Sequence, residues 1–134
     1  MYENLKITEL INEGNKVIDR YLDYPFDHSD ASDLMQCQRL LKKIIILLIG
    51  KAVKYRKKKN HLKLKLSILK RDFAERHKNK ANMTYLRDQD QDISNKELLL
   101  VQYNEVVNEA ESTAEAFKDM SITIAQHLKM FFNV

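Results

Sequence analysis

The chain has 134 residues and a formal net charge of +4, with 44% apolar and 31% charged residues. This composition supplies enough apolar material for a core and excludes a disordered chain. With 2 Gly, 1 Pro and 1 Cys, it also argues against sandwiches, barrels, Rossmann-type folds and disulfide frameworks. The start lacks the features of a signal peptide, and no apolar run is long enough for a membrane span. We therefore expect an intracellular, all-α protein of a few long amphipathic helices with short connections.

The charge is distributed very unevenly along the chain. Residues 1–33 carry 3 Lys/Arg and 8 Asp/Glu. Residues 34–82 carry 16 Lys/Arg and 2 Asp/Glu, and residues 83–134 carry 4 Lys/Arg and 9 Asp/Glu. The central segment is thus strongly basic between two acidic ends. We expect a single helical domain over 1–134, with an acidic N-terminal helix and cap, a basic helical segment and a C-terminal helix in these three ranges. Basic segments attract nucleic acid, anionic membranes or acidic protein faces.

The first helix is predicted over about Asn4 to Leu22, where apolar residues recur every three or four positions. Gly14 lies inside this pattern and weakens it. The helix should end at Asp23-Tyr24-Pro25, because the residue before a proline avoids the α region.

The second helix is predicted to begin at Ser29 or Asp30, both good N-caps, and to reach about Lys78. Its apolar stripe consists of Cys37, Leu41, Ile44, Leu48, Tyr55, Leu62, Leu66, Leu69 and Phe73. On this stripe the cysteine should be buried and inert. Gly50 leaves open whether the segment is one helix or two.

A polar connection is expected over 77–92, with a short strand conceivable over 83–86. The third helix has a capping-box pattern, Ser94-Asn95-Lys96-Glu97, and should run to about Phe132. Its predicted stripe is Leu99, Tyr103, Val106, Ala110, Phe117, Ile124, Leu128 and Phe131, with Val107, Ala114 and Met120 beside it.

The length of this helix, roughly 55 Å, exceeds the diameter of a compact domain of this size. Self-association would cover its apolar stripe, so we expect a homo-oligomer. The alternative is that its apolar end packs onto the chain's own core. The residues predicted for the interface are Phe117, Ile124, Leu128, Phe131 and Phe132.

We expect no catalytic activity, no cofactor and no metal site. The histidines are scattered and lack metal-ligand spacing, and no phosphate loop or nucleophile motif occurs. Residues 88–92 resemble the start of an EF-hand loop, but Ile93 stands where that loop needs glycine. Acidic residues before a helix suit its macrodipole.

The basic segment surrounds its helix with cations around 55–65 and shows no base-reading arrangement. We therefore expect sequence-independent phosphate contacts. Tyr55 and Phe73 could stack on bases, but their place on the apolar stripe favours core packing. A membrane surface is disfavoured because the helix lacks a Trp-rich apolar face. The predicted DNA-binding residues are Lys54, Arg56, Lys57, Lys58, Lys59, Lys63, Lys65, Lys70 and Arg71.

At Leu62-Lys63-Leu64-Lys65-Leu66 the chain resembles the UvsY family, recombination mediators of T-even-like bacteriophages, which carry Leu-Lys-Ala-Arg-Leu late in a basic helix. Thr84-Tyr85-Leu86, the Asp-rich stretch 88–92 and the amphipathic turn 124–131 follow in the family's order. The resemblance covers about residues 51–132. It departs in having Leu and Lys for the family's Ala and Arg, and in lacking the Tyr-Tyr-Ser-Gly-Arg sequence that follows.

The resemblance implies a non-enzymatic mediator in the cytoplasm of the phage-infected host. Such a protein forms a six- or seven-membered ring, binds single-stranded DNA and loads a RecA-like recombinase onto DNA covered by single-strand-binding protein. Lys63 and Lys65 would contact DNA, although they point about 160° apart on a helix. Two alternatives remain: a transcription or replication accessory protein whose basic helix binds an acidic partner, and a purely structural coiled-coil protein.

Overall fold

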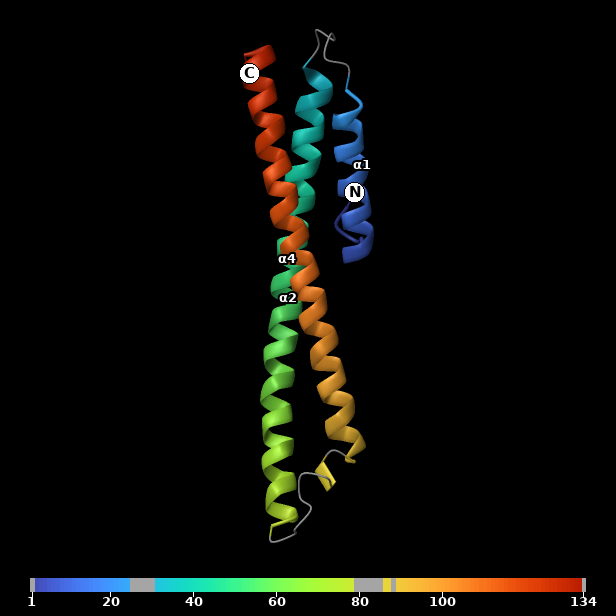
Figure 1. Ribbon diagram of the computed structural model, residues 1–134, viewed down its shortest axis with the longest axis vertical. Helices are drawn as coiled ribbons and strands as arrows, with labels where there is room; N and C mark the ends of the chain where they lie inside the picture. The colour runs from blue at the N-terminus through green and yellow to red at the C-terminus, as the bar shows by residue number, and fades with distance from the viewer. Residues whose placement is uncertain (1, 25–30, 79–85, 88, 134) are drawn as a thin grey trace. The chain divides into compact units, whose positions relative to one another are not determined.

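A computed structural model describes residues 2–24, 31–78, 86–87 and 89–133, which form three long helices and no strand. These are α1 (Ile7–Leu22), α2 (Ser32–Arg76) and α4 (Gln91–Phe132) (Figure 1). The expected all-α fold is confirmed. Within the described part of the chain, no helix has a stretch long and apolar enough to cross a membrane.

Helix α2 continues without interruption through Gly50. The segment is therefore one helix of 45 residues rather than two. A methyl group added at Gly50 would meet no atom within 4 Å, so neither packing nor a turn requires glycine there. The predicted caps Ser29 and Asp30, the proline after the first helix and residues 83–85 of the conceivable strand over 83–86 lie outside the described residues. The last residue of that conceivable strand, Leu86, is helical.

The start of α4 differs from the prediction. The helix begins at Gln91, and its cap is Asp90, whose Oδ1 accepts hydrogen bonds from the backbone N–H groups of Asp92 (3.0 Å) and Ile93 (3.1 Å). The backbone N–H of Ser94 already bonds to the Asp90 carbonyl at 3.0 Å. The predicted capping box at Ser94 is thus wrong, because the aspartate four residues earlier satisfies the first free N–H groups.

The described contacts divide the chain into two compact units, which cut across the three charge-defined segments. Unit 1 comprises Met1–Ala52 and Glu109–Val134, and unit 2 comprises Val53–Asn108. Both α2 and α4 therefore contribute to each unit.

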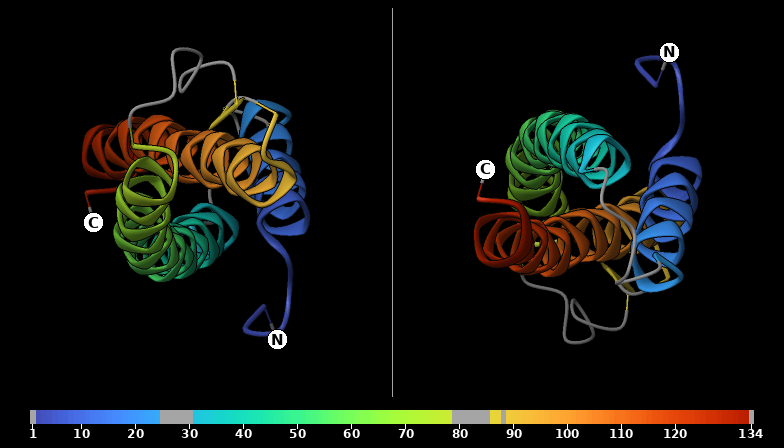
Figure 2. Two further views of the ribbon diagram at one scale, coloured as in Figure 1. Left: turned by 90° about the horizontal axis from the view of Figure 1, so that it is seen from below. Right: turned by 90° about the horizontal axis from the view of Figure 1, so that it is seen from above.

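Unit 1 is built from three helical segments around one apolar core. Seen from above in Figure 2, α1 (blue), the first part of α2 (teal) and the last part of α4 (red) lie at three corners. The predicted stripe of α2 is buried here: Leu41, Ile44 and Leu48 have no exposed surface, and Cys37 is 2% exposed. The buried members of the core are Tyr2, Leu10, Val17, Tyr24, Leu34, Cys37, Leu41, Ile44, Ile45, Leu48, Ala114, Phe117, Ile124 and Leu128.

Helices α1 and α4 approach each other closely at Gly14. This glycine is buried, and a methyl group built on it would lie 2.2 Å from Cε2 and 2.4 Å from Cζ of Phe117. The glycine that weakens α1 in isolation is therefore the position that receives the Phe117 ring. Because such rings supply much of a core's apolar burial, the loss of helix propensity is offset by packing.

Unit 2 has two helical segments and a smaller core. Leu66, Phe73 and Ile93 are buried together, with partly buried leucines packed around them. The buried line of α4 here passes through Ile93 and Val107, whereas the predicted Leu99 is 36% exposed. The α4 stripe is thus rotated from the predicted one in unit 2.

Candidate nucleic-acid interface

The nine predicted DNA-binding cations all lie on α2 within unit 2. Seven of them are exposed, and Lys59 and Lys70 are half-buried. The sequence of unit 2 contains 14 Lys/Arg and 7 Asp/Glu, a net charge of +7, while that of unit 1 has a net charge of −3. The positive field of the protein therefore comes from the unit with the smaller core.

One flank of α2 borders a groove of about 510 Å³ between α2 and α4, here called the unit 2 groove. Lys58 and Lys65 line it and are seven residues apart, so they lie on the same side of the helix. Leu62 and Leu99 supply apolar surface, and Tyr103 adds an aromatic ring. The full lining is Lys58, His61, Leu62, Lys65, Asn95, Lys96, Leu99 and Tyr103.

The opposite flank of α2 is held by polar contacts to α4. Lys59 Nζ donates a hydrogen bond of 2.8 Å to Asn104 Oδ1, and Lys70 Nζ lies 2.9 Å from Glu97 Oε1. Glu97, predicted as the capping-box partner, thus pairs with a lysine of α2. A phosphate that approached this flank would compete with these acceptors.

Lys63 and Lys65 lie on different flanks, as the helical period requires. Lys65 faces the unit 2 groove, whereas Lys63 is one turn from Lys59 and two turns from Lys70 on the flank that contacts α4. Both are exposed. One strand segment that contacts both from a single face is therefore excluded, and each lysine would serve a different stretch of DNA.

The aromatic residues of the basic segment are used mainly in packing. Phe73 is 4% exposed, and its ring centroid lies 4.1 Å from that of His77. Tyr55 is half-buried and meets Tyr103 edge-on at 5.8 Å. This burial agrees with the expectation that both side chains pack in the core. Tyr103 was not predicted as a site residue from the sequence. Asn95, Leu99 and Tyr103 are spaced four residues apart, and this spacing places them on one side of α4.

The residues predicted for oligomerisation separate into two groups. Phe117, Ile124 and Leu128 are 3%, 0% and 3% exposed and belong to the core of unit 1. The chain itself therefore covers them, which is the alternative that the sequence left open. Phe132 packs partly against the same core, while Phe131 is 61% exposed.

Two titrating groups with shifted pKa values, Tyr21 and Cys37, belong to unit 1. Burial raises the pKa of the Cys37 thiol above its ordinary value, in line with the expected inert cysteine. Burial also raises the pKa of Tyr21, whose hydroxyl lies 3.2 Å from His127 Nδ1. Among residues 2–24, 31–78, 86–87 and 89–133, no three His, Cys, Asp or Glu side chains gather closely enough to hold a metal ion.

The arrangement in unit 2 therefore combines exposed cations, an apolar groove with one tyrosine at its side, and a flank whose lysines contact α4. This combination suits a flexible polyanion that carries flat apolar groups. Comparison of the chain with protein-family models, with curated proteins and with solved structures finds no match.

Proposed function

We propose that the protein binds single-stranded DNA without sequence specificity and acts as a recombination mediator. In this role it helps to load a RecA-like recombinase onto DNA covered by single-strand-binding protein. The observation that carries the DNA-binding part is the unit 2 groove, whose apolar lining lies beside Lys58 and Lys65. The mediator part rests on the resemblance of the Leu62–Leu66 element and of the features that follow it to the UvsY family.

The groove favours a single strand over a duplex for a geometric reason. In a duplex the flat faces of the bases are stacked inside, so a lysine-bearing helix meets phosphates and base edges but no base faces. A single strand can turn its bases toward Leu62, Leu99 and Tyr103 while its phosphates meet the lysines. The groove volume of about 510 Å³ lies within the range of roughly 300 to 1,000 Å³ that is common for small-ligand sites.

The mechanism follows from electrostatics. Lysines on both flanks of α2 would draw successive stretches of one strand around the helix and bend it. Bending weakens the hold of the single-strand-binding protein, which needs a continuous stretch of bases, and leaves part of the strand open to recombinase. A homo-oligomeric ring would present several such helices to one strand. In this proposal the exposed Phe131 belongs to the surface available for assembly.

The test is fluorescence anisotropy with a labelled single-stranded oligonucleotide and a duplex of equal length, measured over a range of salt concentrations. We expect tighter binding of the single strand and a steep fall of log affinity with log salt. Changing both Lys58 and Lys65 to alanine should reduce that slope by about 1.4, because each phosphate contact on single strands contributes roughly 0.7.

The matched variant changes Lys59 and Lys70 to alanine. Its effect on the slope should be smaller, because Asn104 and Glu97 already hold these two ammonium groups. Equal slopes for the two double variants would refute the role of the groove flank. Absence of single-strand binding even at low salt would refute the function and favour an accessory protein that binds an acidic partner through its basic helix. The mediator step needs a second assay, the rate of recombinase assembly on DNA covered by single-strand-binding protein.

A further inference from the structure

Unit 1 has a second groove, on a side of its helices where α1 contributes no residue. Two adjoining hollows of about 400 and 340 Å³ share Lys42 and run along α2 and α4. We call this surface the unit 1 groove. It is lined by Met35, Gln38, Arg39, Lys42, Ile45, Ile46, Lys118, Ser121, Ile122, Ala125 and Leu128.

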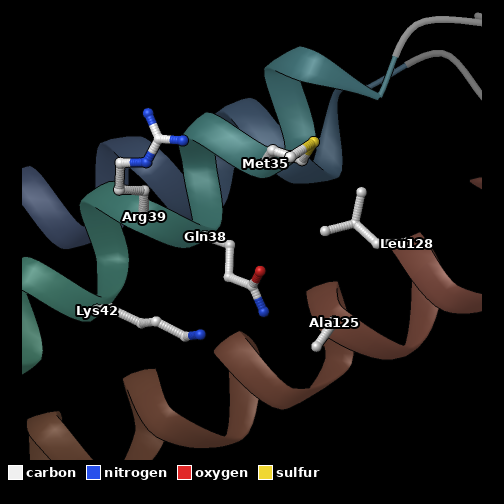
Figure 3. A pocket seen from close by; sticks show the side chains of 6 residues that line it. All are labelled: Met35, Gln38, Arg39, Lys42, Ala125 and Leu128. Atoms are coloured by element: carbon white, nitrogen blue, oxygen red, sulfur yellow. The ribbon is translucent and has the colours of Figure 1, made fainter. Parts of the chain in front are cut away.

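The base of the groove is a fixed contact between the two helices. Gln38 Nε2 donates a hydrogen bond of 3.4 Å to the carbonyl oxygen of Ser121, which is buried. Figure 3 shows Gln38 and Lys42 reaching from α2 toward α4, where Ala125 and Leu128 lie opposite. This hydrogen bond links the two helices at the base of the groove.

The groove exposes large apolar side chains from both helices. Ile46 and Ile122 are 69% and 56% exposed, and Met35 is 39% exposed. Along α2 the groove extends from Met35 to Ile46, about 16 Å at the rise of an α-helix. This length matches three turns of a further helix, which would occupy the fourth position of a bundle beside α2 and α4.

The charges on the walls select the kind of helix. Arg39 and Lys42 line the α2 side and Lys118 the α4 side, and no carboxylate belongs to the described lining. These cations gather on a unit whose net charge is −3. Lys118 pairs with Glu115 at 3.5 Å, but both side chains are exposed, and such surface pairs contribute little to stability. An incoming carboxylate can therefore take its place.

We propose that the unit 1 groove binds an amphipathic helix of a partner protein, three to four turns long, whose apolar stripe is flanked by aspartate or glutamate. The stripe would cover Ile46 and Ile122, and the flanking carboxylates would meet Arg39 and Lys42 on one wall and Lys118 on the other. This is helix-in-groove recognition, in which buried apolar anchors give affinity and the rim charges give specificity. The proposal does not rest on DNA binding, because it concerns unit 1.

The test uses two synthetic helical peptides with the same leucine stripe, one with glutamate and one with lysine on its flanks. Each is labelled with a fluorophore and titrated with the full-length protein near physiological ionic strength. We expect the acidic peptide to bind at least about tenfold more tightly than the basic one, because the lysines of the basic peptide would face Arg39, Lys42 and Lys118, and like charges disfavour a wrong partner. Lys42→Glu should reduce or reverse this preference.

Ile122→Glu should weaken binding of the acidic peptide at least tenfold. Leu98→Glu is the matched control, because Leu98 is 59% exposed on the same helix but lies in unit 2; it should leave peptide binding unchanged. Circular dichroism checks that both variants keep their helices. Equal binding of the two peptides, or no binding of either, would overturn the proposal. Sedimentation velocity provides the other decisive result: dissociation of an oligomer by Ile122→Glu but not by Leu98→Glu would show that a second copy covers the groove.

Discussion

Replacing Gly14 by alanine should destabilise the protein, although the same change at an ordinary helix position stabilises it. In a solvated helix interior, alanine is favoured over glycine by about 1 kcal/mol. At Gly14 the new methyl carbon would lie 2.2 Å from Phe117 Cε2, whereas carbon atoms in contact prefer about 3.5 to 4.0 Å. The ring has little room to yield, since Phe117 is 3% exposed.

The magnitude follows from these two opposing effects. Overpacking a core costs about 1 to 3 kcal/mol, and an overlap of more than an ångström with a buried ring belongs at the upper end. After subtraction of the gain in helix propensity, we expect a net loss of about 2 kcal/mol in the free energy of unfolding. Urea denaturation followed by circular dichroism measures it.

Two further variants make the prediction sharp. Gly50→Ala is the matched control, because the added methyl group meets nothing within 4 Å; it should stabilise the chain by about 0.5 to 1 kcal/mol. Phe117→Leu removes the ring atoms that would overlap. In that background Gly14→Ala should become neutral or stabilising, which gives a coupling energy of about 2 kcal/mol. If Gly14→Ala stabilised the parent protein as much as Gly50→Ala does, the close-approach argument would be refuted.

Other predictions concern the helix start, the buried thiol and the C-terminal stripe. Asp90→Ala should lower the free energy of unfolding by about 1 kcal/mol through loss of the N-cap, and Ser94→Ala by less; urea midpoints compare them. Because burial raises the pKa of Cys37, the folded chain holds that proton longer than the unfolded chain. The protonated thiol therefore contributes its full stabilisation below about pH 8, and this contribution is lost progressively as the pH rises further. Cys37→Ala should reduce the fall of the urea unfolding midpoint at alkaline pH. Ile124→Ser should destabilise the fold by at least about 2 kcal/mol, whereas Phe131→Ser should cost no more than about 1 kcal/mol, through loss of its edge-on contact with the His127 ring; thermal melts distinguish them.

Helical periodicity predicted the elements well because each helix buries a continuous stripe. The second stripe, from Cys37 to Phe73, matches the observed core in both units. The end of α1 at Leu22 and that of α4 at Phe132 also agree with the prediction. Where one face meets one core, spacing alone identifies the buried side.

The features that the sequence did not predict depend on neighbours far along the chain. Gly14 reads as a weak point until the ring of Phe117, more than a hundred residues later, is placed against it. The cap of α4 was misassigned because Asp90 and Ser94 both fit the residue preferences, and preferences do not tell which one starts the helix. The stripe of α4 rotates where it leaves the three-helix core for the two-helix core, so Leu99 and Tyr103 border a groove instead of filling an interior.

The candidate site shows the same limit. The nine cations could be named from composition, and the helical period already separates Lys63 from Lys65. Which flank of α2 contacts α4, however, depends on where α4 lies. Lys59 and Lys70 resemble the other lysines in sequence, and their acceptors, Asn104 and Glu97, are recognised only in three dimensions. The unit 1 groove was not predicted, because Ile46 and Ile122 belong to neither predicted stripe and only the packed helices bring them to one surface.

The unequal cores of the two units have a consequence for how the chain opens. In unit 2 a small apolar cluster holds two helical segments together, and the unit carries a net charge of +7. The positive charges of α2 repel one another, and this repulsion opposes folding of that part of the helix. Regions with few buried contacts are the first to open in native-state hydrogen exchange. The amides of α2 beyond Ala52 should therefore exchange sooner than those before it, and a bound polyanion should slow the early class far more than the late one. Binding of the polyanion could then be followed on α2 alone. It would shift the position along the helix at which fast-exchanging amides give way to slowly exchanging ones.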